Sequence, residues 1–149
     1  TRPGFAWGGI GVAAIWFGGA VAVARRVVEH VTQRSADQIA HLQVGQLDLA
    51  LAASREALAA AAAAVDAARG DEQASGLIAV RARSMVAQTV DTVIRVADHA
   101  MGPAPLAHDV EHAQRVSDLR LYVRQHHAER DVADLGDRVV RAVGDGAAW

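Results

Sequence analysis

The segment from Pro3 to Ala24 contains no charged side chain. A charge-free segment of this length can span a membrane as a helix, or it can run through the middle of a soluble helical core. The segments that follow are amphipathic and need an apolar partner, so we expect a central helix of a soluble bundle. The membrane-anchored alternative stays open, because Arg25 and Arg26 follow the segment as a cytoplasmic flank would.

The composition favours helices and excludes several kinds of site. No proline occurs between residues 4 and 102, and alanine is abundant, so we expect a nearly all-α chain. The 149 residues suffice for one domain with its own core. The absence of cysteine excludes disulfides, thiolate zinc sites and cysteine nucleophiles. A net charge of −2 provides no global field that would attract nucleic acid.

Capping and breaking residues predict five helices. Ser35, with Gln38 three residues later, is typical of a capping box at the start of the second helix. We expect Gly70 to end that helix, Asp71 to cap the third, and Gly102-Pro103 to stop it. The expected helices cover residues 4–33, 35–69, 71–101, 106–125 and 128–143. These helices make up the domain, 1–143, and we expect the tail 144–149 to fray.

Apolar spacing predicts which helix faces are buried. The third helix carries one stripe, formed by Leu77, Val80, Ala87, Val90, Ile94, Ala97 and Met101. The second carries two adjoining stripes, formed by Leu47, Leu51, Leu58 and Val65 and by Ile39, Leu42 and Leu49. Long amphipathic helices with short connections favour an all-α, up-down four-helix bundle with a short extra C-terminal helix.

Two short strings match known motifs without their structural context. Residues 9–14 fit the G-x-G-x-x-A dinucleotide pattern, but no strand precedes them, so we interpret the glycines as helix-packing positions. Residues 108–112 read H-x-x-E-H, the inverted zinc-hydrolase pattern. Two histidines four residues apart share a helix face, but this string lies at a helix N-terminus, where acidic residues are favoured anyway. We therefore expect no metal site.

The most titratable segment is Gln125 to Asp131, which joins the fourth and fifth helices. His126, His127 and Glu129 together are suited to proton transfer, since histidine titrates near neutral pH. A solvated connection, in which Glu129 and Asp131 cap the next helix, is the alternative. Spacing alone leaves both interpretations open.

The order of these elements resembles the C-terminal all-helical domain of the acyl-CoA dehydrogenase family, the flavin enzymes that oxidise the Cα–Cβ bond of acyl thioesters. A Gly/Ala-rich first helix is followed by Arg34, and Leu42-Gln43 opens the second. The third helix ends in Met101-Gly102, and the fourth carries the string Asp118-Leu119-Arg120. Residues 121–131 are similar to the ending of actinobacterial members and of related flavin monooxygenases. The resemblance covers nearly the whole chain.

The resemblance implies roles for particular residues. Arg34 matches an arginine that reaches flavin phosphates or adenine across a subunit interface, although the family's following Phe-Gly is missing. Gln43 matches a glutamine near that interface, and Gly102 matches a turn glycine that lets backbone approach a neighbouring flavin. The family's catalytic Glu lies in an E-G-T string that is absent here. His126, His127 and Glu129 take its place, so dehydrogenase and monooxygenase chemistry both stay open.

The family's flavin pocket also needs an N-terminal helical domain and a middle β domain. The resemblance therefore implies that this chain is the C-terminal part of a larger, cytoplasmic FAD-dependent oxidoreductase. It would form the core of a homo-oligomer, a dimer or tetramer, and one wall of the site for flavin and acyl thioester. The chain alone should bind FAD weakly. The alternative is a stand-alone helical interaction module or membrane-anchored module without catalytic activity.

Overall fold

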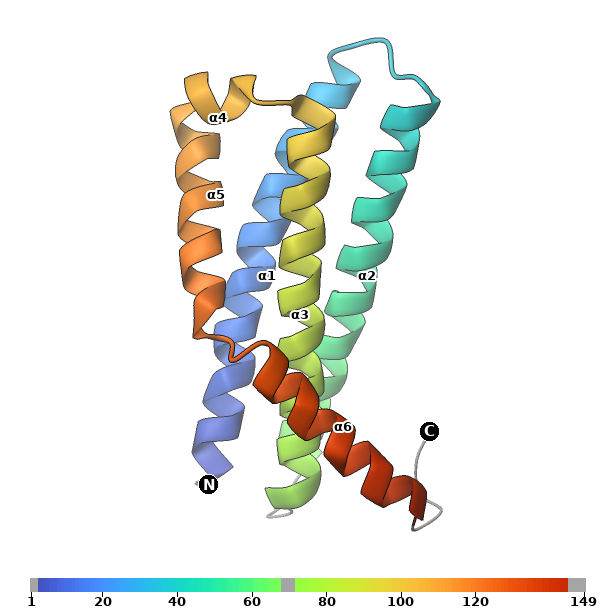
Figure 1. Ribbon diagram of the computed structural model, residues 1–149, viewed down its shortest axis with the longest axis vertical. Coiled ribbons are helices and arrows are strands. Elements are labelled where there is room, and N and C mark those ends of the chain that lie inside the picture. Colours follow the sequence, from blue (N-terminus) through green and yellow to red (C-terminus); the bar gives the residue numbers. More distant parts are fainter. Residues whose placement is uncertain (1–2, 68–71, 145–149) are drawn as a thin grey trace.

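The computed structural model describes residues 3–67 and 72–144. Within these residues the chain forms helices and no strand, as predicted. Figure 1 shows α1, α2, α3 and α5 running along the long axis of the molecule, while α6 crosses in front of the lower part of α3. The helices are α1 (Pro3–Thr32), α2 (Gln38–Ala67), α3 (Glu72–Met101), α4 (Ala104–His108), α5 (Val110–Tyr122), the 3₁₀ turn η1 (Val123–Gln125) and α6 (Glu129–Gly144).

Helix α1 supplies a large part of the buried core, while Ile15 and Val28 on it are 58% and 40% exposed. It contacts α2, α3 and α5. Trp16, Val23 and Val27 are fully buried, because three other helices cover different sides of α1. The segment Trp7–Thr32 of α1 is long and apolar enough to cross a membrane, and 39% of its most apolar stretch is buried. Core helices of soluble proteins can have the same length and apolar composition. Length and composition alone therefore leave its environment open.

Helix α3 buries the predicted stripe. Val90, Ile94 and Ala97 are buried against α1 and α2, whereas Leu77 and Val80 near the start of the helix are half-buried. The helix ends as expected at Gly102, which adopts φ +67°. Its N–H donates to the carbonyl of residue 98 at 3.0 Å. A side chain is strained at such a φ, so glycine suits this position.

The predicted capping box of α2 is wrong. The helix begins at Gln38, and Asp37 Oδ1 accepts the N–H of Ala40 at 2.8 Å. Asp37 is therefore the N-cap, and Ser35 lies two residues before it. Both residue types cap well, so two candidate caps only two positions apart made the sequence signal ambiguous. The expected roles of Gly70 and Asp71 lie outside the described residues.

Only one of the two predicted stripes on α2 faces the core. Leu47 is buried and Leu51 is half-buried, whereas Ile39, Leu42 and Leu49 are 59%, 56% and 73% exposed. The second stripe therefore points away from the bundle. A polar bridge joins α2 to α3 inside, where Ser54 Oγ donates to Thr89 Oγ1 at 2.7 Å and Thr89 Oγ1 donates to the carbonyl of Ala50 at 3.1 Å.

The predicted fourth helix, 106–125, is broken into α4, α5 and η1. The break is at Asp109, whose extended backbone (φ −102°, ψ 94°) ends α4 and starts α5. The Asp109 carboxylate accepts the N–H of His112 at 3.0 Å and the Nε–H of Arg26 at 2.9 Å. Asp109 thus caps α5 and fixes its start against α1. The fifth predicted helix is present as α6, while residues 145–149 of the expected tail lie outside the described residues.

Candidate functional site

The turn between α5 and α6 holds His126 inside the lower part of the bundle. The N–H of His126 donates to the carbonyl of Val123 at 2.9 Å, which closes η1. The side chain of His126 is only 7% exposed, and its ring lies 6.2 Å from the ring of Trp16 on α1. Trp16 also meets Tyr122 edge to face at 6.4 Å. Aromatic packing thus fixes the position of the imidazole.

Asp131, in the first turn of α6, faces both histidines of this turn. Its Oδ2 lies 3.0 Å from His126 Nδ1, and its Oδ1 lies 3.8 Å from His127 Nδ1. The side chain of His127 is 73% exposed, so it has no fixed environment comparable to that of His126. Asp131 was expected at most to cap the helix. The fold instead makes it the partner of a buried imidazole.

The environment of His126 favours a neutral ring. Burial lowers the pKa of His126 below its usual value, and the nearby cations of Arg83 and protonated His127 lower it further, while Asp131 opposes both effects. Asp131 lies close to Nδ1, but Nδ1 makes no hydrogen bond of good geometry within the described part of the chain, so the contact with the carboxylate is electrostatic. A neutral ring can accept a proton, as a general base requires.

A groove of about 450 Å³ opens beside His126, between α3 and the start of α6. Its floor is mostly apolar, and the hydroxyl of Ser84 in its wall is buried without a hydrogen-bond partner in the described part of the chain. Asp91 and Glu129 are exposed and also line the groove. The structure therefore brings His126 and Glu129 to one groove, while His127 is not among the lining residues. The other lining residues are Ala87, Gln88, Ala128, Val132 and Ala133.

Arg83 on α3 is a functional candidate that sequence reasoning missed. Its guanidinium lies 5.7 Å from the centre of the Trp16 ring and donates to the carbonyl of Gln125 at 3.3 Å. A Cβ at Gly9 would lie 2.9 Å from Arg83 Cδ, so the absent side chain leaves room for the arginine. Gly9 is thus a packing glycine, as interpreted from its sequence. An arginine at this position was expected only to be solvated, and no local pattern signals its contact with Trp16.

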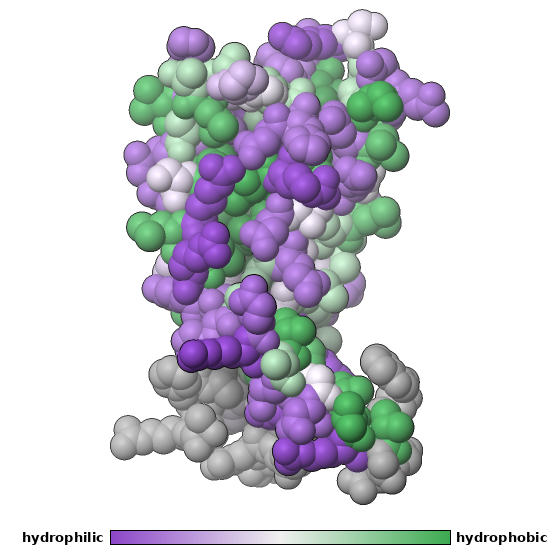
Figure 2. All heavy atoms as spheres, viewed as in Figure 1, coloured by the Kyte–Doolittle hydropathy of each residue, from purple (hydrophilic) through white to green (hydrophobic). Residues whose placement is uncertain are grey.

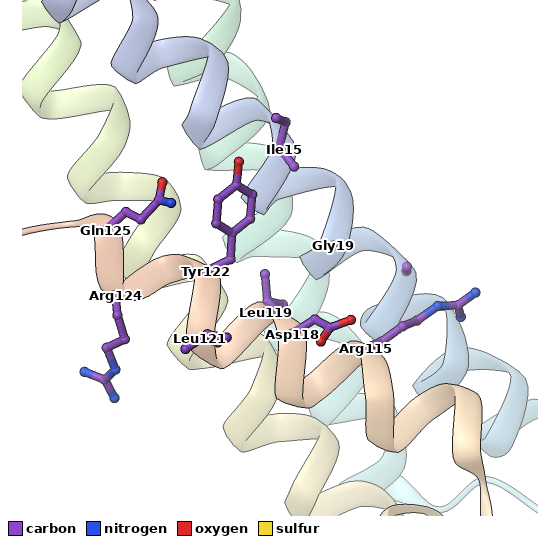
Figure 3. Close-up of a pocket in the computed structure, with 10 residues that line it drawn as sticks. Ile15, Gly19, Arg115, Asp118, Leu119, Leu121, Tyr122, Arg124 and Gln125 are labelled. Carbon is purple, nitrogen blue, oxygen red and sulfur yellow. The ribbon is translucent and has the colours of Figure 1, made fainter.

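A larger groove lies between α1 and α5 and reaches η1. Its volume is about 780 Å³. Figure 3 shows Tyr122 and Leu119 directed toward α1, where Ile15 and Gly19 lie, while Arg124 points away from the other side chains. Gln125 lines this groove and His126 lines the smaller one, so adjacent residues of one turn border both hollows.

The residues that the resemblance assigns to the cofactor lie at one end of the bundle, away from this turn. Arg34 and Gln43 line one hollow of about 290 Å³ with His30 and His99, and Gly102 follows α3 at the same end. On α3, His99 and Ala100 line this hollow and residues from Ser84 to Asp91 line the groove of His126, so the two lie about 12–24 Å apart along the helix at 1.5 Å per residue. One chain therefore does not bring the two predicted sets together.

The H-x-x-E-H string does not lie on one helix. His108 is the last residue of α4, Asp109 breaks the helix, and His112 is buried on α5. The shared face that would let the two histidines chelate a metal is therefore absent. No group of three or more His, Asp or Glu side chains suited to a metal ion occurs within the described ranges.

Comparisons with protein-family models, with curated proteins and with solved structures find no match to this chain. The likeness to the acyl-CoA dehydrogenase family therefore remains an expectation from the sequence.

Proposed function

We propose that this chain is the C-terminal helical domain of a larger FAD-dependent oxidoreductase of the acyl-CoA dehydrogenase type, with His126 as its general base. One observation carries the proposal. A buried imidazole lies 3.0 Å from a carboxylate oxygen and lines a groove, and the resemblance assigns this segment to the proton-abstracting group. A solvated connection between two helices has no need of this arrangement.

The proposed reaction removes a proton and a hydride from adjacent carbons of an acyl thioester. His126 Nε2 would accept the proton, while Asp131 would stabilise the resulting imidazolium through Nδ1. Bound FAD supplies the hydride acceptor, so the electron pair leaves the substrate as the double bond forms. Glu129 lines the same groove and is the second candidate base. The apolar groove between α1 and α5 suits the alkyl part of the substrate.

The hollow at Arg34 fits only part of a flavin nucleotide. Its volume of about 290 Å³ lies below the range of roughly 300–1,000 Å³ that is typical of whole small-molecule sites. An exposed guanidinium beside the half-buried Gln43 suits a single phosphate group. Because this hollow and the groove of His126 are lined by separate stretches of α3, we propose that Arg34 contacts the flavin of a neighbouring subunit. FAD would then bind weakly to the isolated chain.

Self-association follows from the same proposal. We assign the up-down four-helix arrangement to α1, α2, α3 and α5, with α6 as the extra helix. This is supported by the contacts of α1 with the three others and of α2 with α3. The second stripe of α2 points away from this core and offers a surface to another subunit. We place the protein in the cytoplasm as a dimer or tetramer.

The test uses the full-length gene product that contains this chain, purified with its flavin. Flavin absorbance establishes the cofactor. His126→Ala should then lower turnover by at least about tenfold while flavin stays bound, since general bases contribute roughly 10²- to 10⁴-fold. His127→Ala should have a smaller effect, because its side chain is exposed. Full turnover in His126→Ala and in Glu129→Gln would assign the base to another part of the protein.

A second candidate is a membrane-anchored or purely structural module. The observation that favours it is that α1 is long and apolar enough to cross a membrane. Extraction separates the two candidates. The oxidoreductase domain should purify without detergent, and a requirement for detergent would favour the anchored module.

A further inference from the structure

The side of α2 that faces away from the bundle forms a continuous surface. No charged residue lies along the middle of this surface between residues 42 and 53. Leu42 and Leu49 are more than half exposed on it, and Gly45 between them has nothing within 4 Å of where a Cβ would lie. Figure 2 shows apolar side chains along the edge of the molecule on the side where α2 runs. Exposed apolar surface of this kind marks an interaction site. We call residues Leu42, Gly45, Leu49, Ala52, Ala53, Glu56, Ala60 and Ala63, which follow one another at helical spacing, the outer face of α2.

The two halves of the outer face of α2 differ in size and match each other. The first half carries Leu42 and Leu49, whereas the second half carries Ala53, Ala60 and Ala63. An antiparallel copy of the helix would place the leucines of one half over the alanines of the other. A parallel copy would instead stack leucine on leucine and alanine on alanine. A surface that complements itself in this way fits a two-fold pair.

The charged residues beside the outer face also favour antiparallel packing and indicate its register. Asp48 and Arg55 are exposed, and their separation of seven residues places them on one flank. Within the described ranges, Arg55 forms an ion pair with the neighbouring Glu56, at 3.5 Å, and Asp48 forms none. In a two-fold antiparallel pair, the same flank of α2 from the two copies lies side by side. Asp48 of one copy then faces Arg55 of the other if the axis passes near residues 51–52. The same axis places Leu49 opposite Ala53 and Leu42 opposite Ala60.

We propose that the outer face of α2 packs antiparallel against α2 of a second copy of this chain, with Asp48 paired to Arg55 on both sides of the axis. This pairing rests on the self-association that we propose above and specifies its geometry. It involves neither the flavin nor His126. Its failure would therefore leave the flavin and turnover measurements untouched, and their failure would leave the pairing untouched.

Disulfide trapping tests the direction of packing, because the chain contains no cysteine of its own. Ala52→Cys places a thiol next to the axis and should give a covalent dimer of most of the chain under mild oxidation. Ala63→Cys is the matched control on the same face, where the two thiols would lie about 35 Å apart along the helices. It should stay monomeric on a non-reducing gel. Equal cross-linking at both positions would indicate parallel or random contact, and no cross-linking at either would overturn the proposal.

Charge reversal tests the register. Asp48→Arg and Arg55→Asp should each weaken dimerisation, measured as Kd by sedimentation, at least about tenfold, because each places like charges together. The double variant restores the opposite charges and should recover a Kd within about threefold of the original. Arg95→Asp, an exposed reversal on α3, is the control for net charge and should leave Kd unchanged. A double variant as weak as the single ones would overturn the pairing.

Discussion

The environment of His112 on α5 makes it sensitive to acid. The residue is 3% exposed, and its Nδ1 is buried without a hydrogen-bond partner in the described part of the chain. Burial lowers the pKa of His112 below its usual value; the cations of Arg26 and Arg115 act in the same direction, while Asp109 and Asp98 oppose them. A neutral imidazole is therefore buried where α5 packs on the rest of the bundle, and protonating it there costs free energy.

This environment predicts that acid destabilises the fold through His112. Below pH 6.5 the unfolded chain binds a proton that the folded His112 does not, so the free energy of unfolding falls as the pH falls. The slope reaches at most about 1.4 kcal/mol per pH unit for one group. Urea unfolding at pH 7.5 and at pH 5.5 should show a smaller loss in His112→Leu than in the original chain. His108→Leu, at an exposed site, should change nothing. Equal pH dependence in all three chains would contradict the prediction.

Sequence patterns predicted single residues unevenly, and the reason is physical. Gly102 could be identified because the C-terminus of a helix needs a residue at positive φ, which is a local requirement. The contact of Asp131 with His126 is also close in sequence, but its direction depends on Ala128, which adopts φ 42°. An alanine gives no sign of such a conformation. Arg83 depends on Trp16 and Gly9 of another helix, and long-range contacts have no local signature.

At the scale of the helices, periodicity identified the buried faces and failed at two points. The stripe of α3 was predicted because helical spacing determines which side chains share a face. The outward stripe of α2, which includes Leu49, was expected inside because spacing alone does not tell which apolar face of a helix the rest of the chain covers. The break at Asp109 was missed because the carboxylate that caps α5 also binds Arg26 of α1, and that partner is distant in sequence.

The stripe of α3 gives a direct prediction for stability. Ile94 is 7% exposed and faces the core, whereas Arg95, the next residue round the helix, is exposed. Ile94→Asp should lower the free energy of unfolding by several kcal/mol, on the order of the total stability of a domain, because an unpaired carboxylate would be buried. Arg95→Asp should cost within about 0.5 kcal/mol. Circular dichroism during urea titration measures both. Similar losses would show that the stripe is misassigned.

Two adjacent glycines of α1 predict how closely α5 packs. A Cβ at Gly19 would lie 3.0 Å from Leu119 Cδ1, whereas a Cβ at Gly18 would meet nothing within 4 Å. Gly18→Ala should therefore stabilise the chain by up to about 1 kcal/mol through helix propensity. Gly19→Ala gains the same propensity but must displace Leu119, so its melting temperature should lie below that of Gly18→Ala. The opposite order would mean that α5 docks differently on α1.

At the scale of the whole molecule, the two predicted sets of site residues lie apart along one bundle. His126 borders a groove beside the middle of α3, and Arg34 borders a hollow at the upper end of the bundle (Figure 1). Arg34 follows α1 and Gln43 lies on α2, whereas His126 lies between η1 and α6, so each set is fixed to its own part of the bundle. If both sets serve flavin chemistry, a complete site needs His126 from one subunit and Arg34 from another.

This division predicts that two inactive variants of the full-length protein restore activity when mixed. Arg34→Ala should weaken flavin retention by removing a cation from the phosphates, while His126→Ala should keep flavin and lose turnover. In a hybrid dimer of the two, one site combines an intact His126 with the intact Arg34 of the other subunit. Random mixing makes half of the dimers hybrids with one intact site each, so turnover should return to roughly a quarter of the original. If each subunit used its own Arg34, no hybrid site would be intact, and co-expression would give only the average of the two variants.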